Sequence, residues 1–278
     1  MKKLYFILIS ICLLPSCSND SSTNDPNPNL LQRVDFYSGL TFERRWFFNS
    51  DGLLNEITKA DGTIVQNFTY DSNNRLTSST LFNDNGVNET HTFTYDSNDF
   101  VTTVDGEVVN YDSALNAYYT GDLNQSYRIT KINNEKLIVE GKTAYMDYDA
   151  DIGYFEVTLN EIFVNYSINN NILYISPNES CNSFTYDNNS NPIRNATLAI
   201  CRAFSYIENS RWVNGQNNSA NNPLSQNYCS EDPESEVYQY TYNSNNLPIT
   251  QTRDNYYNGV YENTISSVKY YYQGDVIP

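Results

Sequence analysis

The stretch FTYDSNNRLTSST, Phe68–Thr80, returns with small changes as FTYDSNDFVTTV from Phe93, FTYDNNSNPIRNAT from Phe184 and YTYNSNNLPITQT from Tyr240. A phrase that recurs along one chain indicates a small structural unit that pairs with copies of itself. In the first copy, Phe68 and Tyr70 are two residues apart and therefore share one face of a strand. Residues 71–74 then favour a turn, and Leu76 begins a return strand. Each copy therefore predicts one β-hairpin.

The rest of the chain has the same kind of pattern. Asp-Gly or Asn-Gly pairs, which favour tight hairpin turns, begin at Asp51, Asp61, Asn85, Asp105, Asn214 and Asn258. The segment 127–176 alternates as strands do, and weaker echoes of the repeat begin at Trp46 and Val109. No stretch shows a convincing helical period. The sequence predicts an all-β fold, an antiparallel meander of β-hairpins that forms a curved or barrel-like sheet.

The first 29 residues predict an export signal and a tether. Lys2 and Lys3 precede the apolar run Leu4–Leu14, which has the length of a signal-peptide core and, at about 16 Å as a helix, is too short to cross a bilayer. The run ends in Leu-Pro-Ser-Cys at Cys17, which resembles the bacterial lipobox, whose cysteine is acylated; an ordinary cleaved signal is the alternative. We expect a lipoprotein signal peptide over 1–17, a disordered polar tether over 18–29 and a single all-β domain over 30–278.

The composition is strongly acidic. The formal net charge is −17, and removal of a signal peptide that contains Lys2 and Lys3 would make it more negative. Such a charge repels nucleic-acid phosphates and anionic membrane surfaces. We therefore expect no nucleic-acid partner and a membrane association only through the lipid anchor.

Three cysteines belong to the expected domain: Cys181, Cys201 and Cys229. An exported protein lies where disulfides persist, so one bridge and one leftover thiol are expected. Cys181 and Cys201 flank the third copy of the repeat and could face each other across its hairpin, whereas Cys201 with Cys229 would close the polar excursion between them. The only histidine is His91 and no Cys-x-x-Cys spacing occurs, so neither a zinc site nor any cofactor is expected.

The repeat also brings a family resemblance. Tyr70-Asp71-x-x-Asn74-Arg75-Leu76 resembles the YD repeat of Rhs-type proteins, with asparagine where that pattern usually has glycine. Together with the signal, the tether and the length, these degenerate repeats resemble the YD-like lipoproteins of Bacteroidota, some of which have a porin-like β fold. The resemblance implies an outer-membrane lipoprotein, facing the periplasm or the cell surface. It implies no catalytic residues, because none are established for the family.

The sequence does not favour an enzyme. His91 lies in phase with Phe93 on its expected strand, which is typical of a structural histidine. Asp147, Asp149 and Asp151 are spaced like the start of a calcium loop, but Ile152 stands where such a loop requires glycine. A glycosidase needs only two carboxylates, and none of the many here is marked as a pair.

Binding has more support in the composition, which includes 25 tyrosines. Tyrosine and tryptophan present a flat apolar face and a polar tip, which suits sugars and protein partners. Trp212, in the polar excursion 208–236, is either a core plug or a contact residue, and Tyr256 and Tyr257 precede an expected turn as possible glycan or partner contacts. We expect a non-catalytic binding role; a structural scaffold of the envelope and a polysaccharide-acting enzyme are the alternatives.

The repeated tyrosines themselves predict a structural role. Tyr70, Tyr95, Tyr186 and Tyr242 each stand just before a turn, two residues after another aromatic residue. Neighbouring hairpins would bring these pairs together across the sheet. One face of the sheet is therefore expected to carry a largely buried aromatic ladder.

Overall fold

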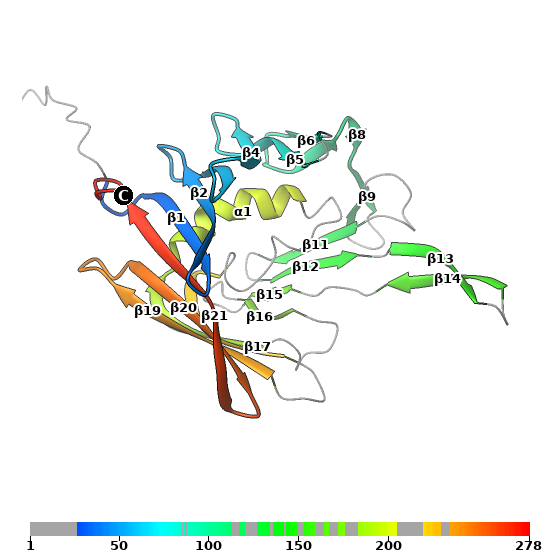
Figure 1. Ribbon diagram of the computed structural model, residues 1–278. Helices are drawn as coiled ribbons and strands as arrows, with labels where there is room; N and C mark the ends of the chain where they lie inside the picture. Colours follow the sequence, from blue (N-terminus) through cyan, green and yellow to red (C-terminus); the bar gives the residue numbers. More distant parts are fainter. Residues whose placement is uncertain are drawn as a thin grey trace, which may run out of the picture.

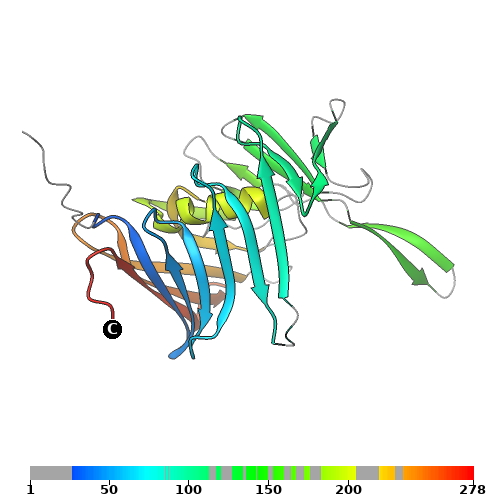
Figure 2. The same ribbon diagram turned by 90° about the horizontal axis from the view of Figure 1, so that it is seen from above.

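The computed structural model describes residues 27–84, 86, 88–111, 183–200, 203–204, 219–228 and 234–278 in full, and the backbone of residues 201–202 and of the strands between 110 and 175. Thirteen antiparallel strands form one curved run around the one helix that the described residues contain (Figures 1 and 2). These strands are β1 Leu31–Ser38, β2 Thr41–Phe48, β3 Leu54–Lys59, β4 Ile64–Tyr70, β5 Leu76–Phe82, β6 Asn88–Tyr95, β7 Val101–Val104, β8 Glu107–Val108, β17 Ser183–Ser190, β18 Asn221–Asn227, β19 Glu234–Tyr242, β20 Pro248–Tyr257 and β21 Val260–Tyr272. The all-β prediction is confirmed.

The strands follow chain order except at one joint. Across the sheet the order is β8-β7-β6-β5-β4-β3-β2-β1-β21-β20-β19-β18-β17, so the joint is the pairing of β1 with β21. Six strands continue the array to a total of 19: β9 Asn110–Asp112, β10 Ala117–Tyr119, β11 Tyr127–Asn133, β12 Lys136–Gly141, β15 Val164–Tyr166 and β16 Ile172–Ile175. The strands β13 Thr143–Asp149 and β14 Gly153–Leu159 form a separate hairpin. No pairing between described residues joins β8 to β9, and the sheet is not closed.

Four hairpins share one turn structure, which explains the repeated phrase. After β4, Asp71 Oδ1 accepts hydrogen bonds from the backbone N–H groups of Asn73 (2.9 Å) and Arg75 (3.0 Å). The equivalent side chains of Asn49, Asp96 and Asn243 bond the backbone two and four residues later. The fourth residue of each turn has positive φ, at Gly52, Asn74, Asp99 and Asn246. Gly, Asn and Asp tolerate that conformation best, so they occupy the position that the YD pattern gives to glycine.

The same four hairpins share one β-bulge. In the β4–β5 pair, Thr69 lies opposite Ser78 while Tyr70 lies opposite Leu76, so the return strand carries an extra residue. The register shifts at the equivalent position in β2–β3, β6–β7 and β19–β20. The hairpins expected from Phe68, Phe93, Tyr240 and the echo at Trp46 are therefore present.

The motif tyrosines join neighbouring hairpins. The phenol of Tyr70 donates to the carbonyl of Leu54, and that of Tyr95 to the carbonyl of Leu76, both at 2.7 Å. Each acceptor is the first residue of the return strand in the preceding hairpin. The aromatic residues two positions earlier, Phe68 and Phe93, are buried, whereas the two tyrosine rings are only half-buried. The aromatic ladder therefore has a fully buried row of phenylalanines and a tethered row of tyrosines.

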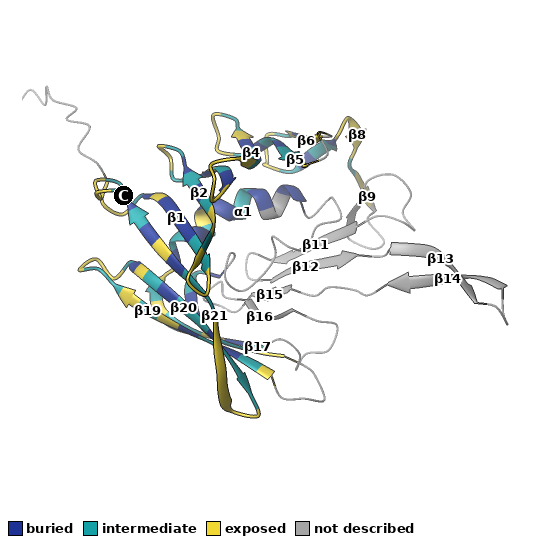
Figure 3. Ribbon diagram, in the orientation of Figure 1, coloured by how far each residue is buried: buried dark blue, intermediate teal, exposed yellow. Residues whose placement is uncertain are grey.

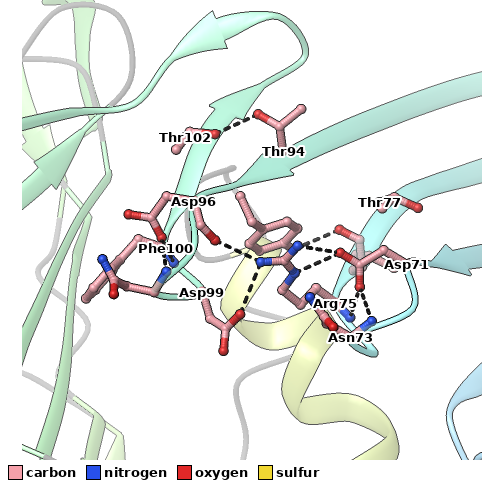
Figure 4. A network of polar contacts seen from close by, with 12 residues as sticks. Asp71, Asn73, Arg75, Thr77, Thr94, Asp96, Asp99, Phe100 and Thr102 are labelled. Atoms are coloured by element: carbon pink, nitrogen blue, oxygen red, sulfur yellow. Dashed lines mark hydrogen bonds and ion pairs between the residues drawn. The ribbon is translucent and has the colours of Figure 1, made fainter.

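Arg75 adds a second link between the first two copies (Figure 4). Its guanidinium donates to Asp71 within its own turn (2.7 Å), and to the carbonyl of Asp96 (2.9 Å) and the carboxylate of Asp99 (3.1 Å) in the next turn. It also lies 4.9 Å from the centroid of the Tyr95 ring. In the one copy that keeps the Arg-Leu pair of the YD pattern, the arginine therefore links its own turn to the next turn.

The third copy does not form a hairpin, which corrects the sequence prediction. After β17 the chain enters helix α1, Pro192–Phe204. Asn191 caps this helix, because its Oδ1 accepts from the N–H of Ile193 at 3.0 Å, and Pro192 suits the first helical position. The buried residues are Ile193, Ala196, Thr197, Ile200, Ala203 and Phe204. Their spacing of three and four residues is a helical period. The sequence prediction took Asn191-Pro192 as a turn and therefore did not recognise this period.

Helix α1 fills the concave side of the sheet (Figure 2). It packs on a core of buried residues from β1–β7 that includes Leu54, Leu76 and Phe93, with Phe93 and Phe204 ring centroids 5.8 Å apart. The face of the sheet that carries this core is called the inner face below. Val268 and Tyr270 belong to the same core, so cross-strand partners of Val268 also lie on the inner face.

Candidate functional site

The inner face changes from apolar to polar toward one end of β18–β20. Tyr240 and Gln251 lie on the inner face because Gln251 is opposite both Tyr240 and Val268. Every second residue of β19 shares that face, so Tyr238, Glu236 and Glu234 follow Tyr240 along it. Along this row of alternate residues, the inner face of β19 changes from the buried Tyr238 to the exposed Glu234.

The strand register arranges the polar side chains in rows. The outermost row is Tyr228, Glu234 and Tyr257, because the Tyr228 N–H donates to the Glu234 carbonyl (3.1 Å) and Glu234 pairs with Tyr257. The next row is Gln226, Glu236 and Asn255, and the innermost pair is Tyr238 and Arg253. These eight residues are called the tyrosine–glutamate face.

Glu236 is the centre of this face. The Tyr238 phenol donates to its Oε2 at 2.6 Å, and an Arg253 Nη2 lies 3.3 Å from its Oε1. Burial and a hydrogen bond to Glu236 raise the pKa of Tyr228 above its ordinary value. Glu236 therefore holds two phenols and one guanidinium in fixed positions, which offsets the desolvation of a carboxylate that is only 5% exposed.

Along β19, exposure increases from the innermost pair to the outermost row. Tyr238 is 2% exposed and Tyr228 is 36% exposed, although the Arg253 side chain in the innermost pair is already 32% exposed. Glu234 is exposed, and Asn255 and Tyr257 are half-buried. The outer rows can therefore meet solvent while the inner pair holds them in place. Carboxylates accept, the guanidinium donates and the amides do both, so this set can bond several hydroxyls of one ligand.

Next to the innermost pair, the inner face carries a group of hydrogen-bonded polar side chains. Gln251 Nε2 donates to the Tyr240 phenol at 2.7 Å, and the Tyr270 phenol donates to Gln251 Oε1 at 3.5 Å. Burial raises the pKa of Tyr240 and of Tyr270 above the ordinary value. These phenols therefore stay neutral and remain hydrogen-bonded to Gln251.

The two adjacent tyrosines predicted as contacts lie on opposite faces of β20. Tyr257 belongs to the tyrosine–glutamate face, whereas Tyr256 points to the outer face and packs edge-on against Tyr261, with ring centroids 5.8 Å apart. The tip of this hairpin is exposed (Figure 3). The structure therefore separates Tyr256 from Tyr257 and adds Tyr228, Glu234, Glu236 and Arg253.

Most of the other residues predicted as functional have no described side chain. Cys17, Cys181, Trp212 and Cys229 lie outside the described residues, as do the side chains of residues 147–151. Cys201 lies on α1, so the hairpin across which Cys181 and Cys201 were expected to face each other does not exist. That geometric reason for their pairing was wrong, because a helix replaces the return strand.

His91 lies between two carboxylates and a ring of helix α1. Its Nδ1 lies 2.8 Å from Asp105 Oδ2 and its Nε2 3.1 Å from Glu89 Oε1, and its ring meets Phe204 edge-on. Among the described residues, no group of three or more His, Cys, Asp or Glu could hold a metal ion. The described part of the chain also has no helix with the length and apolar character to cross a membrane.

Comparison with known proteins gives a likeness of structure. No family model and no curated protein matches the sequence. Among solved structures, the chain is similar to a porin-like protein from Bacteroides uniformis, with a TM-score of 0.36 and 13% identity, over 89% of this chain and 98% of that one.

Proposed function

We propose that this chain is a non-catalytic binding protein of the bacterial envelope. A lipid on Cys17 holds it at the outer membrane, on the periplasmic side or at the cell surface, and residues 18–29 tether the domain. The lipobox-like end of the signal and the polar segment after it support this placement. The degenerate YD repeats support membership of the YD-like lipoproteins of Bacteroidota.

The observation that carries the binding role is the tyrosine–glutamate face. On β4 and β5 the inner face is mainly apolar, and its buried polar side chains Gln66 and Ser79 bond each other. On β18–β20 the inner face ends in tyrosine, glutamate, arginine and amide side chains, and along β19 the exposure rises from Tyr238 to Glu234. Aromatic rings among fixed polar groups are the usual make-up of a site that orients a polar ligand.

Two measurements test this function. The soluble domain from Leu30 is applied to a glycan array and, in parallel, to an envelope-protein extract, and saturable binding is expected. In cells, Cys17→Ala should abolish acyl labelling and release the protein from the membrane fraction. Continued acyl labelling of that variant would contradict the anchor, and no saturable binding in either assay would contradict the binding role.

A mainly structural role is the second candidate. It is favoured by the hydrogen bonds of Tyr70 and Tyr95 to neighbouring hairpins, which hold the sheet as a scaffold. Under this function the domain binds neither glycans nor envelope proteins, yet its deletion weakens the envelope. Release of shorter sugars from an array polysaccharide would instead make the protein an enzyme.

A further inference from the structure

We infer that one patch on the outer face of the sheet contacts the phospholipid headgroups of the membrane that carries the lipid anchor. This inference rests on the anchor at Cys17 in the proposed function and adds a second membrane contact, which sets the orientation of the anchored domain. The outer face is the side of the sheet opposite the inner face. The cation–aromatic patch, on β1, β2 and β21, consists of Arg33, Asp35, Tyr37, Phe42, Arg45, Phe47, Lys269 and Tyr271.

The pairing of β1 with both of its neighbours arranges these side chains in three rows. Val34 belongs to the core, so Arg33 and Asp35 on either side of it point to the outer face. Across β2, β1 and β21 the rows are Phe47, Arg33 and Tyr271; then Arg45, Asp35 and Lys269; then Phe42, Tyr37 and Ser267. Two cations therefore flank a central carboxylate, and aromatic rings lie in the rows on either side.

Asp35 holds the patch in place. It is 2% exposed and accepts hydrogen bonds from Arg33 and Arg45, both at 2.8 Å. The Arg33 guanidinium also lies 4.4 Å from the centroid of the Tyr271 ring. The Arg45 guanidinium lies 4.8 Å from the centroid of the Phe42 ring. Because one carboxylate binds two guanidinium groups, the centre of the patch keeps a positive charge.

Lys269, Arg45 and the half-buried rings are the parts that can reach a membrane. Lys269 is exposed, its Nζ lies 5.3 Å from the centroid of the Tyr37 ring, and it forms no ion pair with another described residue. The Arg45 side chain is 28% exposed. Aromatic rings beside cations are typical of a membrane–water interface, where the rings lie among the headgroups and the cations reach the phosphates.

The place of the patch along the chain is the second reason. The expected tether ends at Asn29, and Arg33 follows four residues later, at most about 13 Å along an extended chain. The tether itself spans at most about 40 Å. A lipid on Cys17 therefore keeps the first row of the patch near the bilayer surface, and the patch needs only to turn toward it.

Charge limits the strength of this contact. The chain has a net charge of −17, and two carboxylates border the patch: Glu43 in the bulge of β2 and Glu56 opposite Phe47. Charges more than about 8 Å away are largely screened at physiological ionic strength, so the bordering carboxylates oppose the contact most. Each accessible cation contributes about fivefold to partition onto an anionic bilayer. Such a contact orients the anchored domain without holding it, and release of Cys17→Ala is still expected.

The test uses residues 18–278 without lipid, and vesicles of phosphatidylglycerol and phosphatidylcholine in equal amounts. Lys59 provides a matched control, because it is an exposed lysine outside the patch, where it pairs with Asp84. Lys269→Ala and Lys59→Ala lose the same charge. In co-sedimentation at low salt, Lys269→Ala should weaken partition about fivefold and Lys59→Ala less than about twofold. Lys269→Arg keeps the charge and should partition like the natural chain. Thermal unfolding checks that each variant is folded.

Two results would overturn the inference. If Lys269→Ala and Lys59→Ala weaken partition equally, net charge alone acts and the patch has no special part in the contact. If the natural chain does not partition onto these vesicles at low salt, the outer face makes no headgroup contact. Either result leaves the lipid anchor intact, because the anchor is tested separately by acyl labelling of Cys17→Ala.

Discussion

The two halves of the inner face use the same hairpins for different purposes. In β2–β7 the buried core of the inner face is mainly apolar, with Leu54, Phe68, Leu76 and Phe93 each at most 3% exposed. The polar residues on this part of the face, Gln66, Ser79 and His91, lie beside that core. In β18–β20 the inner residues are tyrosine, glutamine, glutamate and arginine. Yet the turn after β4 and the turn after β19 have the same hydrogen bonds and the same bulge.

The difference shows that turn chemistry and inner-face chemistry are independent. The turn and bulge set the hairpin, whatever lies on the inner face. Because the helix and the apolar half supply a core, the other half is free to carry polar groups that cost stability.

The largest expected effect is in the apolar half. Phe68 is 2% exposed, and Phe68→Ala leaves a cavity in the core. It should lower the free energy of unfolding by about 3–5 kcal/mol. Tyr257→Ala, in the polar half, should lower it by about 1 kcal/mol or less. Urea titration followed by tryptophan fluorescence measures both, and equal losses would break the comparison.

Tyr95 tests the tether between hairpins. Tyr95→Ala should lower the free energy of unfolding by about 3 kcal/mol, because it removes a ring packed against the core. Tyr95→Phe keeps the ring and loses only the hydrogen bond to Leu76, so about 1 kcal/mol is expected. Glycan binding should be unchanged in both. Loss of binding without loss of stability in Tyr95→Ala would make this tyrosine a contact residue.

The sequence predicts the hairpins well because their signals are local. Asp71 and its equivalents act within five residues, and alternation marks the strands on either side. Helix α1 was missed because Asn191-Pro192 is both a turn signal and a cap-and-first-turn signal. Only the spacing of Ile193, Ala196 and Ile200 distinguishes the two.

The candidate site was predictable only in part. Tyr257 could be singled out beside its turn, but its separation from Tyr256 depends on the face of the strand. Glu236 and Arg253 meet because β19 and β20 pair in one register, and Tyr228 joins them from another segment. A single sequence gives no direct measure of such pairings. The alternation in Glu234–Tyr242 was the one local signal.

High pH should weaken the polar half. Burial, and after it a hydrogen bond to Asp187, raise the pKa of Tyr242 to about 12. Burial likewise raises the pKa of Tyr240 and Tyr272. A phenol whose pKa is raised by folding contributes its full stability below the unfolded pKa of about 10, and this stability is lost as pH rises from 10 toward 12.

Solvent screening limits the Tyr242 share of this loss to about 1 kcal/mol, because its ring is only half-buried. Thermal unfolding between pH 8 and pH 11.5 measures it. Tyr242→Phe should show a shallower decline above pH 10 than the natural chain, and an identical decline would mean that this phenol ionises as freely in the folded state.

The smallest expected effect tests what the two halves share. Asn74 and Asn246 have φ of 62° and 58° at equivalent turn positions, one in each half. An alanine there must adopt the left-handed conformation, which costs roughly 1 kcal/mol, whereas glycine adopts it freely. Asn74→Ala and Asn246→Ala should therefore each lower the free energy of unfolding by about 1 kcal/mol, and the glycine variants by less than about half of that. Chemical denaturation of the four variants decides the matter. Because the turn is independent of the inner face, the two alanine variants should agree within error. A loss confined to Asn74→Ala would show that the apolar core, rather than the turn itself, sets the cost, and the two halves would then differ in their turns as well as in their inner faces.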